Sequence, residues 1–114
     1  MELSIRTESR DTVSIVYPEG FINAHTVSQF EQVLKDMVTG EKYHLVINCH
    51  ELQYISSAGL GALMGVIEEV RDNDGDIRLC GMSESVFNVF DILGFTELYQ
   101  IFDDEDRAIQ SFGA

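Results

Sequence analysis

The spacing of apolar residues switches repeatedly along this chain between a strand-like and a helix-like period, and this switching limits the folds open to it. The N-terminal segments SIRTES and TVSIVYPEG contain short alternating or β-branched runs, and the second run ends at Pro18 and Gly20. Runs of this kind predict a hairpin of two strands. We therefore expect the chain to open with β structure.

Helix and strand patterns alternate after this hairpin. From Thr26 to Val38 apolar residues recur at helical spacing, Thr26 and Gln29 fit a capping box, and Gly40 follows the segment. The segment YHLVINC is a nearly continuous apolar run, which predicts a central strand covered on both faces. A second helical stripe then ends at the turn-rich DNDGD, and its apolar members are Leu63, Met64, Val66, Ile67 and Val70.

The C-terminal part continues the alternation. The segment IRLCG predicts a strand, Ser83 is placed to cap a third helix that ends before Gly94, and LYQIF predicts a last strand. A terminal helix is marked by Ala108, Ile109 and Phe112. No linker or repeat interrupts this order, so the sequence predicts one α/β domain over residues 1–114. Its sheet is expected to be mixed and mostly parallel, with about five strands and about four helices.

Charge and composition exclude several classes of partner. Twenty acidic residues against seven basic ones give a formal net charge of -13, which disfavours nucleic acid and anionic membrane surfaces. The N-terminus has no apolar core of signal-peptide length, and no apolar run approaches membrane-spanning length, so we expect a cytoplasmic protein. Cys49 and Cys80 end apolar runs and have no histidine at metal-site spacing. They are predicted to be buried, reduced thiols, and no metal or cofactor is expected.

The stretch YISSAGLG places two hydroxyls and two glycines where a strand gives way to the second helix. Ser56 and Ser57 would lie beyond the carboxyl end of the central strand, at a helix N-terminus, where open-sheet proteins place their sites. Free N–H groups and the helix dipole favour negative charge there, so a phosphate on one serine would be accommodated. Gly59 and Gly61 would let a partner's backbone approach. A purely structural reading stays open, in which Ser56 caps the helix and the glycines relieve crowding.

The order of these segments resembles that of a known family. The segment YISSAGLGALM, preceded by LVINCHEL and followed by IRLCGMSESVFNVFDILGFTELYQIFDDEDRAI, resembles the STAS domain of bacterial anti-sigma factor antagonists over nearly the whole chain. The segment PEGFINAHTVSQFEQVL is similar to that family's early turn and first helix. The resemblance implies a partner switch in which a GHKL-type serine kinase doubles as the anti-sigma factor. Phosphorylation of a serine at the start of the second helix then releases the antagonist, and a PP2C-type phosphatase restores it.

Aligning Gly59-Leu60-Gly61 with the family's Gly-Leu-Gly places the phosphoacceptor at Ser57, with Ser56 as the second choice. Two positions depart from the family, because Ser56 and Asn23 stand where an aspartate is usual. The partner-binding residues that the resemblance implies are Asn23, His25, Ser56, Ser57, Ala58, Gly59, Gly61 and Met64.

Two other function classes stay open beside the switch. The chain could be a constitutive scaffold module of another signalling or transport complex, in which Ser57 is never modified; Asn23 and Ser56 favour this reading. An enzyme is not expected, because the histidines show no metal-site spacing and the G-x-S-x-G elbow of serine hydrolases is absent. A weak homodimer is also left open.

Overall fold

The computed structural model, which describes residues 2–113, contains a six-stranded mixed sheet in the order β1-β2-β3-β5-β6, with β4 paired to β2. Only β1 and β2 are antiparallel among the strand pairs of the described residues. The strands are β1 Leu3–Arg10, β2 Val13–Ile22, β3 His44–Asn48, β4 Leu52–Ile55, β5 Asp76–Cys80 and β6 Ile101–Phe102. The helices are α1 Val27–Thr39, α2 Ser57–Asp72, α3 Glu84–Ile92 and α4 Glu105–Gln110, with a short 3-10 helix η1 at Phe95–Glu97. The predicted α/β class and opening hairpin are confirmed, and Met1 and Ala114 lie outside the described residues.

Strand β2 is longer than the sequence pattern indicated, because it continues through Pro18 and Gly20. Its lower half, Ser14–Val16, pairs with β3, and its upper half, Gly20–Ile22, pairs with β4. The position of Pro18 falls between these two parallel partners, where the missing N–H interrupts neither ladder. Strand β4 itself was not predicted, since LQYI is too short and polar to stand out.

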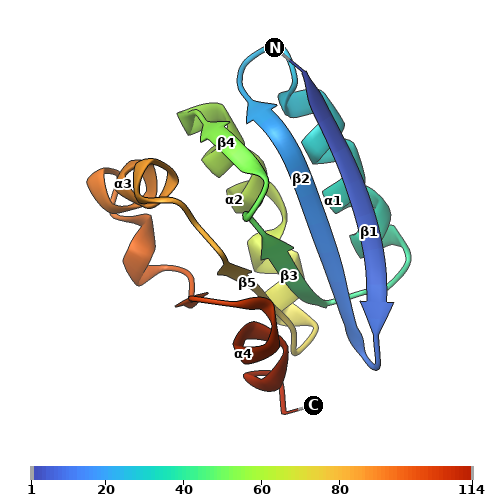
Figure 1. Ribbon diagram of the computed structural model, residues 1–114. Coiled ribbons are helices and arrows are strands. Elements are labelled where there is room, and N and C mark those ends of the chain that lie inside the picture. Colours follow the sequence, from blue (N-terminus) through green and yellow to red (C-terminus); the bar gives the residue numbers. More distant parts are fainter. Residues whose placement is uncertain (1, 114) are drawn as a thin grey trace.

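The helices cover the two faces of the sheet unequally. Figure 1 shows α1 and α2 on one side and α4 on the other. Successive residues of β3 point to opposite cores: Leu45 and Ile47 join the larger core under α1 and α2, whereas Val46 joins the smaller core under α4. The prediction of a central strand buried on both faces is therefore confirmed. Cys49 and Cys80 are free and buried as expected, and burial raises the pKa of the Cys80 thiol to about 12.

Two local predictions were wrong. Thr26 and Gln29 form no capping box: the Thr26 hydroxyl donates to the Phe21 carbonyl at 2.7 Å, and the Gln29 amide donates to the Leu3 carbonyl at 3.4 Å. The predicted strand LYQIF shrinks to Ile101–Phe102, because residues 98–100 form a turn after η1. The amides of Leu98 and Tyr99 donate there to the Phe95 carbonyl, and the Tyr99 ring is buried in the main core. The predicted cap of α3 is confirmed, since Ser83 Oγ accepts a hydrogen bond from the Val86 amide at 3.2 Å.

Candidate functional site

The ends of two parallel strands bring the predicted site together. Ile22 at the end of β2 is in register with Ile55 at the end of β4, and the Ser56 amide donates to the Ile22 carbonyl at 2.9 Å. The turn that follows β2 and the first turn of α2 therefore lie at the same edge of the sheet. We call this region the Ser57 corner and define it as residues Asn23–Thr26 together with Ser56–Gly61. The predicted site thus follows β4 and not, as expected, the central strand β3.

The two serines of the corner are presented differently. Ser57 is the first residue of α2 and is exposed. Ser56 precedes it in an extended conformation, and its Oγ is buried with no hydrogen-bond partner among the described residues. The structural reading supposed that the Ser56 side chain caps α2, and the structure shows no such cap. Of the two hydroxyls, the one on Ser57 is the one that an enzyme could reach.

Backbone groups add electrostatic character to the corner. The Ser56 carbonyl accepts the amides of Gly59 and Leu60, at 2.9 and 3.4 Å, which starts the helical pattern. The amides of Ser57 and Ala58 precede this pattern, and Ser56 Oγ caps neither of them. Unpaired N–H groups and the positive end of the helix dipole favour an anion there. A phosphate on Ser57 would lie beside these groups.

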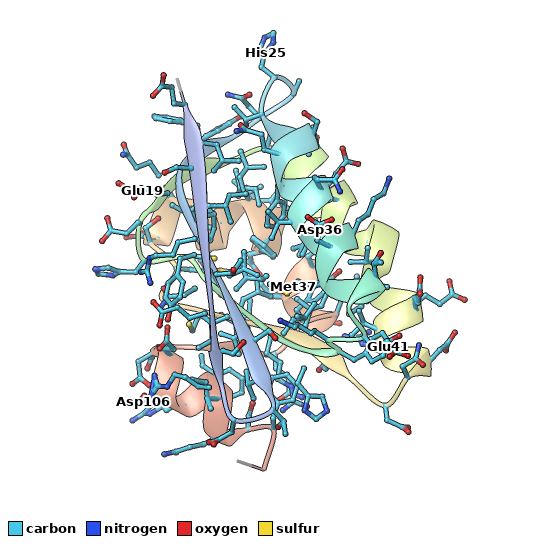
Figure 2. The ribbon with its side chains drawn as sticks, turned by 90° about the vertical axis from the view of Figure 1, so that its right-hand side faces the viewer. Glu19, His25, Asp36, Met37, Glu41 and Asp106 are labelled. Atoms are coloured by element: carbon cyan, nitrogen blue, oxygen red, sulfur yellow. The ribbon has the colours of Figure 1, made fainter. Side chains whose placement is uncertain are left out.

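The Asn23 turn is closed by its own side chains. Asn23 Oδ1 accepts hydrogen bonds from the amides of His25 and Thr26, at 2.9 and 3.1 Å, and the Asn23 amide donates to Thr26 Oγ1 at 2.9 Å. The Asn23 side chain thus shapes the turn. His25 is exposed and projects into solvent at one end of the molecule, as Figure 2 shows. It makes no hydrogen bond to Ser57 within residues 2–113.

The glycines of α2 have two different environments. A Cβ on Gly59 would lie 2.6 Å from Ile55 Cγ1 and 2.8 Å from Ile22 Cγ2, so this buried glycine lets α2 pack onto the sheet. The predicted role of Gly59 in partner access is therefore corrected to internal packing. A Cβ on Gly61 or Gly65 would meet no atom of the described residues within 4 Å. Because neither glycine has a side chain, the backbone of α2 is accessible on its outer side at these two positions.

An exposed strip results on α2. Ser57, Gly61, Met64 and Gly65 are all exposed and follow the spacing i, i+4, i+7 and i+8, which places them on one side of the helix. Met64 is 45% exposed, and the Tyr99 hydroxyl contacts its sulfur at 3.6 Å. Ala58 is half-buried beside the strip. Most of the predicted partner-binding residues are thus gathered along one edge, and Gly59 lies beneath it.

Sequence reasoning missed an aromatic pair next to this corner. The rings of Phe21 on β2 and Tyr54 on β4 lie 6.4 Å apart, and Tyr54 is 46% exposed. The segment LQYI gave no clear signal, because it does not alternate: Leu52 and Ile55 are buried and the two residues between them are exposed. Without β4, nothing placed Tyr54 beside Phe21.

The three histidines occupy separate places. His44 stacks on Phe112 with ring centroids 4.9 Å apart, whereas His50 is exposed beside Glu51 and His25 lies at the corner. Within residues 2–113 no group of three His, Cys, Asp or Glu side chains is arranged to hold a metal ion.

The helices of this part of the chain are all too short or too polar to cross a membrane.

Comparisons with known proteins agree with this architecture. The family model of the STAS domain matches residues 4–108. The anti-sigma-B factor antagonist of Listeria monocytogenes is 30% identical over 102 residues, which cover 89% of this chain and 90% of that protein. The crystal structure of an anti-sigma factor antagonist from Mycobacterium paratuberculosis superposes with a TM-score of 0.91 at 20% identity, covering 99% of this chain and 96% of that one. The structure of the Bacillus cell fate determinant SpoIIAA in its phosphorylated form has a TM-score of 0.73 at 19% identity and covers 96% and 99%. The chain belongs to the STAS domain family.

Proposed function

We propose that this protein is an anti-sigma factor antagonist that is switched by phosphorylation of Ser57. The observation that carries the proposal is the contrast between the exposed Ser57 at the start of α2 and the buried Oγ of Ser56. The name of the Listeria monocytogenes relative, an anti-sigma-B factor antagonist, supports the same function. Such a protein acts in the cytoplasm, where sigma factors act.

The proposed partner is a GHKL-type serine kinase that is also the anti-sigma factor. It would dock on the Ser57 corner and on the exposed strip of α2, with Gly61 and Gly65 allowing close approach. Binding of the antagonist and binding of the sigma factor to the kinase would be mutually exclusive, so docking frees the sigma factor.

Phosphorylation would reverse this docking through charge. A phosphate adds about -1.5 to -2 charges at neutral pH to a chain that already carries a net charge of -13. The free amides at the start of α2 accommodate that charge within the antagonist. The docked kinase would lose close contact at the same point, so the complex weakens. A PP2C-type phosphatase would restore the docking form.

The test is phosphorylation and binding with the purified full chain and its GHKL-type kinase. We expect the kinase and ATP to add one phosphoryl group to the wild type and to Ser56→Ala, and none to Ser57→Ala, by intact mass and peptide mapping. In calorimetry, Ser57→Glu should bind the kinase about tenfold more weakly or worse than the wild type, a loss of about 1.4 kcal/mol.

A matched control is Ser9→Asp, which adds a charge on β1 near the hairpin turn, at the opposite end of β2 from the corner. This variant should bind like the wild type. Unmodified Ser57 together with wild-type affinity of Ser57→Glu would instead support the constitutive scaffold module. Asn23 favours that alternative, because it stands where the family usually has an aspartate. Its side-chain oxygen accepts hydrogen bonds within the turn.

A further inference from the structure

The edge of the sheet formed by β6 has no strand partner within residues 2–113. Figure 1 shows α3 and the segment after it at the side of the molecule opposite to β1. The amides of Leu79 and Gly81 donate to the carbonyls of Gln100 and Phe102, at 3.0 and 3.2 Å. In a parallel pair with this register, the N–H and C=O groups of Ile101 point away from β5. One donor and one acceptor are therefore available on the outer edge.

Two hollows lie along this edge, and both are lined by Phe87 of α3 together with Ile101 and Phe102. The larger hollow, about 640 Å³, extends toward Leu98, and the smaller, about 350 Å³, extends toward Asp103. We call the two together the β6 groove. The side chains of an added strand alternate in direction, so apolar side chains could enter the two hollows in turn.

Exposed apolar side chains are concentrated in the segment from α3 to Leu98, and two of them, Phe87 and Leu98, line the groove. Six large hydrophobic residues are exposed among the described residues, and four of them lie between α3 and the end of the segment that follows η1. These four are Phe87 at 39%, Ile92 at 82%, Leu93 at 46% and Leu98 at 42% exposed. A local concentration of this kind marks an interaction surface more than scattered exposure would.

The charges around the groove define its occupant. Glu97 lines the larger hollow, and Glu84 and Asp103 line the smaller one. Glu84 and Glu97 form no ion pair within the described chain. Asp103 pairs with Arg107 at 3.6 Å, but its side chain is 93% exposed and this surface pair is weak. The arginine of the groove, Arg71, is already bound to Asp76 and to the Leu98 carbonyl. An acidic rim of this kind attracts lysine and arginine and repels a second copy of this acidic chain.

We propose that the β6 groove binds an extended protein segment in which apolar residues alternate with lysine or arginine. The segment adds a strand to β6 through Ile101, places apolar side chains in the two hollows, and brings its cations to Glu97 and Asp103. None of the residues that line this second docking surface belongs to the Ser57 corner, and the groove adjoins the exposed strip of α2 where Tyr99 contacts Met64. It does not depend on the antagonist function proposed above.

The experiment compares two short synthetic peptides on the ¹⁵N-labelled full chain by NMR. One peptide alternates valine with lysine and the other alternates valine with glutamate. The lysine peptide should shift the amide resonances of Phe87 and of residues 100–103, and the glutamate peptide should bind at least about tenfold more weakly, a difference of about 1.4 kcal/mol. The double variant Glu97→Lys with Asp103→Lys should reverse this preference, and its exposed positions leave folding intact.

A backbone variant tests the strand addition itself. Ile101→Pro removes the outward N–H while the inward bonds of Gln100 and Phe102 stay available, so it should abolish binding. Ile101→Val is the matched control and should bind like the wild type. Equal shifts with both peptides, no shift with either at millimolar concentration, or shifts that depend on protein concentration without peptide would overturn the proposal. The last of these outcomes would identify a second copy as the occupant.

Discussion

Gly59 and Gly61 stand two residues apart in the first turns of α2, yet the fold uses them for opposite purposes. The missing Cβ of Gly59 leaves room for Ile22 and Ile55, which end β2 and β4. Gly61 faces open space. A motif of two glycines therefore combines one residue for packing with one for the surface, and residue type alone does not distinguish them.

Substituting alanine at each glycine separates the two roles. Gly59→Ala should destabilise the protein relative to Gly61→Ala by about 1–3 kcal/mol, because the new methyl overpacks the contact with two isoleucines. Gly61→Ala should stabilise by about 0.5–1 kcal/mol, since it restricts the unfolded chain and no neighbour obstructs the methyl. Urea denaturation of both variants measures the difference. Equal stabilities would show that the helix shifts to accept the methyl at Gly59.

At the scale of elements, the helices differ in whether a side chain caps their first turn. Ser83 Oγ and Asp104 Oδ1 accept backbone amides at the starts of α3 and α4, at 3.2 and 2.9 Å. Ser56 holds the corresponding position before α2 without such a bond. The Ser56 Oγ is buried instead, where an unpaired hydroxyl costs stability. The first turn of α2 thus keeps its amides free at the expense of a better-capped helix.

Alanine at the two N-cap serines should have different effects. Ser83→Ala should destabilise by about 1 kcal/mol, because it removes a cap that satisfies the Val86 amide. Ser56→Ala should leave stability unchanged or raise it, because it removes a buried hydroxyl that has no partner. Thermal unfolding followed by circular dichroism measures both. A similar loss in the two variants would mean that Ser56 caps α2 in solution.

At the scale of the whole molecule, Glu105 connects α4 to two distant parts of the sheet. Its carboxylate accepts hydrogen bonds from Arg10 at the end of β1, at 2.8 Å, and from Asn48 at the end of β3, at 3.0 Å. Burial alone would raise the pKa of this carboxyl, but its polar contacts with Tyr17, Arg10 and Asn48 outweigh burial and lower the pKa. The acidic segment DDEDR at residues 103–107 therefore includes a residue, Glu105, that fixes the C-terminal helix α4 to the sheet.

The lowered pKa sets a direction for the pH dependence of stability. Because the folded state holds the Glu105 proton less tightly than the unfolded state does, the stabilisation is complete above the ordinary pKa of 4.5 and is lost as pH falls through the lower folded value. Glu105→Gln should cost about 1–2 kcal/mol at pH 7 and less than that in acid. Urea denaturation from neutral to acid pH provides the comparison. Asp106→Asn is the control: its carboxylate is exposed and should contribute at most about 0.5 kcal/mol at any pH.

The sequence by itself determined the α/β class, the opening hairpin, the doubly buried strand β3 and the cap of α3. These features depend on local periodicity and on contacts between residues near one another in the chain, which a sequence displays directly. The choice of Ser57 within its motif came from the resemblance to the STAS family.

Only the tertiary structure decided where that motif lies and which of its atoms are accessible. The pairing of β4 with β2 joins residues 32 or more positions apart, and it places Ser57 beside the Asn23 turn and Tyr54 beside Phe21. The same pairing buries Gly59 against Ile22 and Ile55, while Ser56 Oγ is buried and the Ser57 side chain is left exposed. The order of residues does not contain these outcomes, because each depends on which distant strand end a side chain meets.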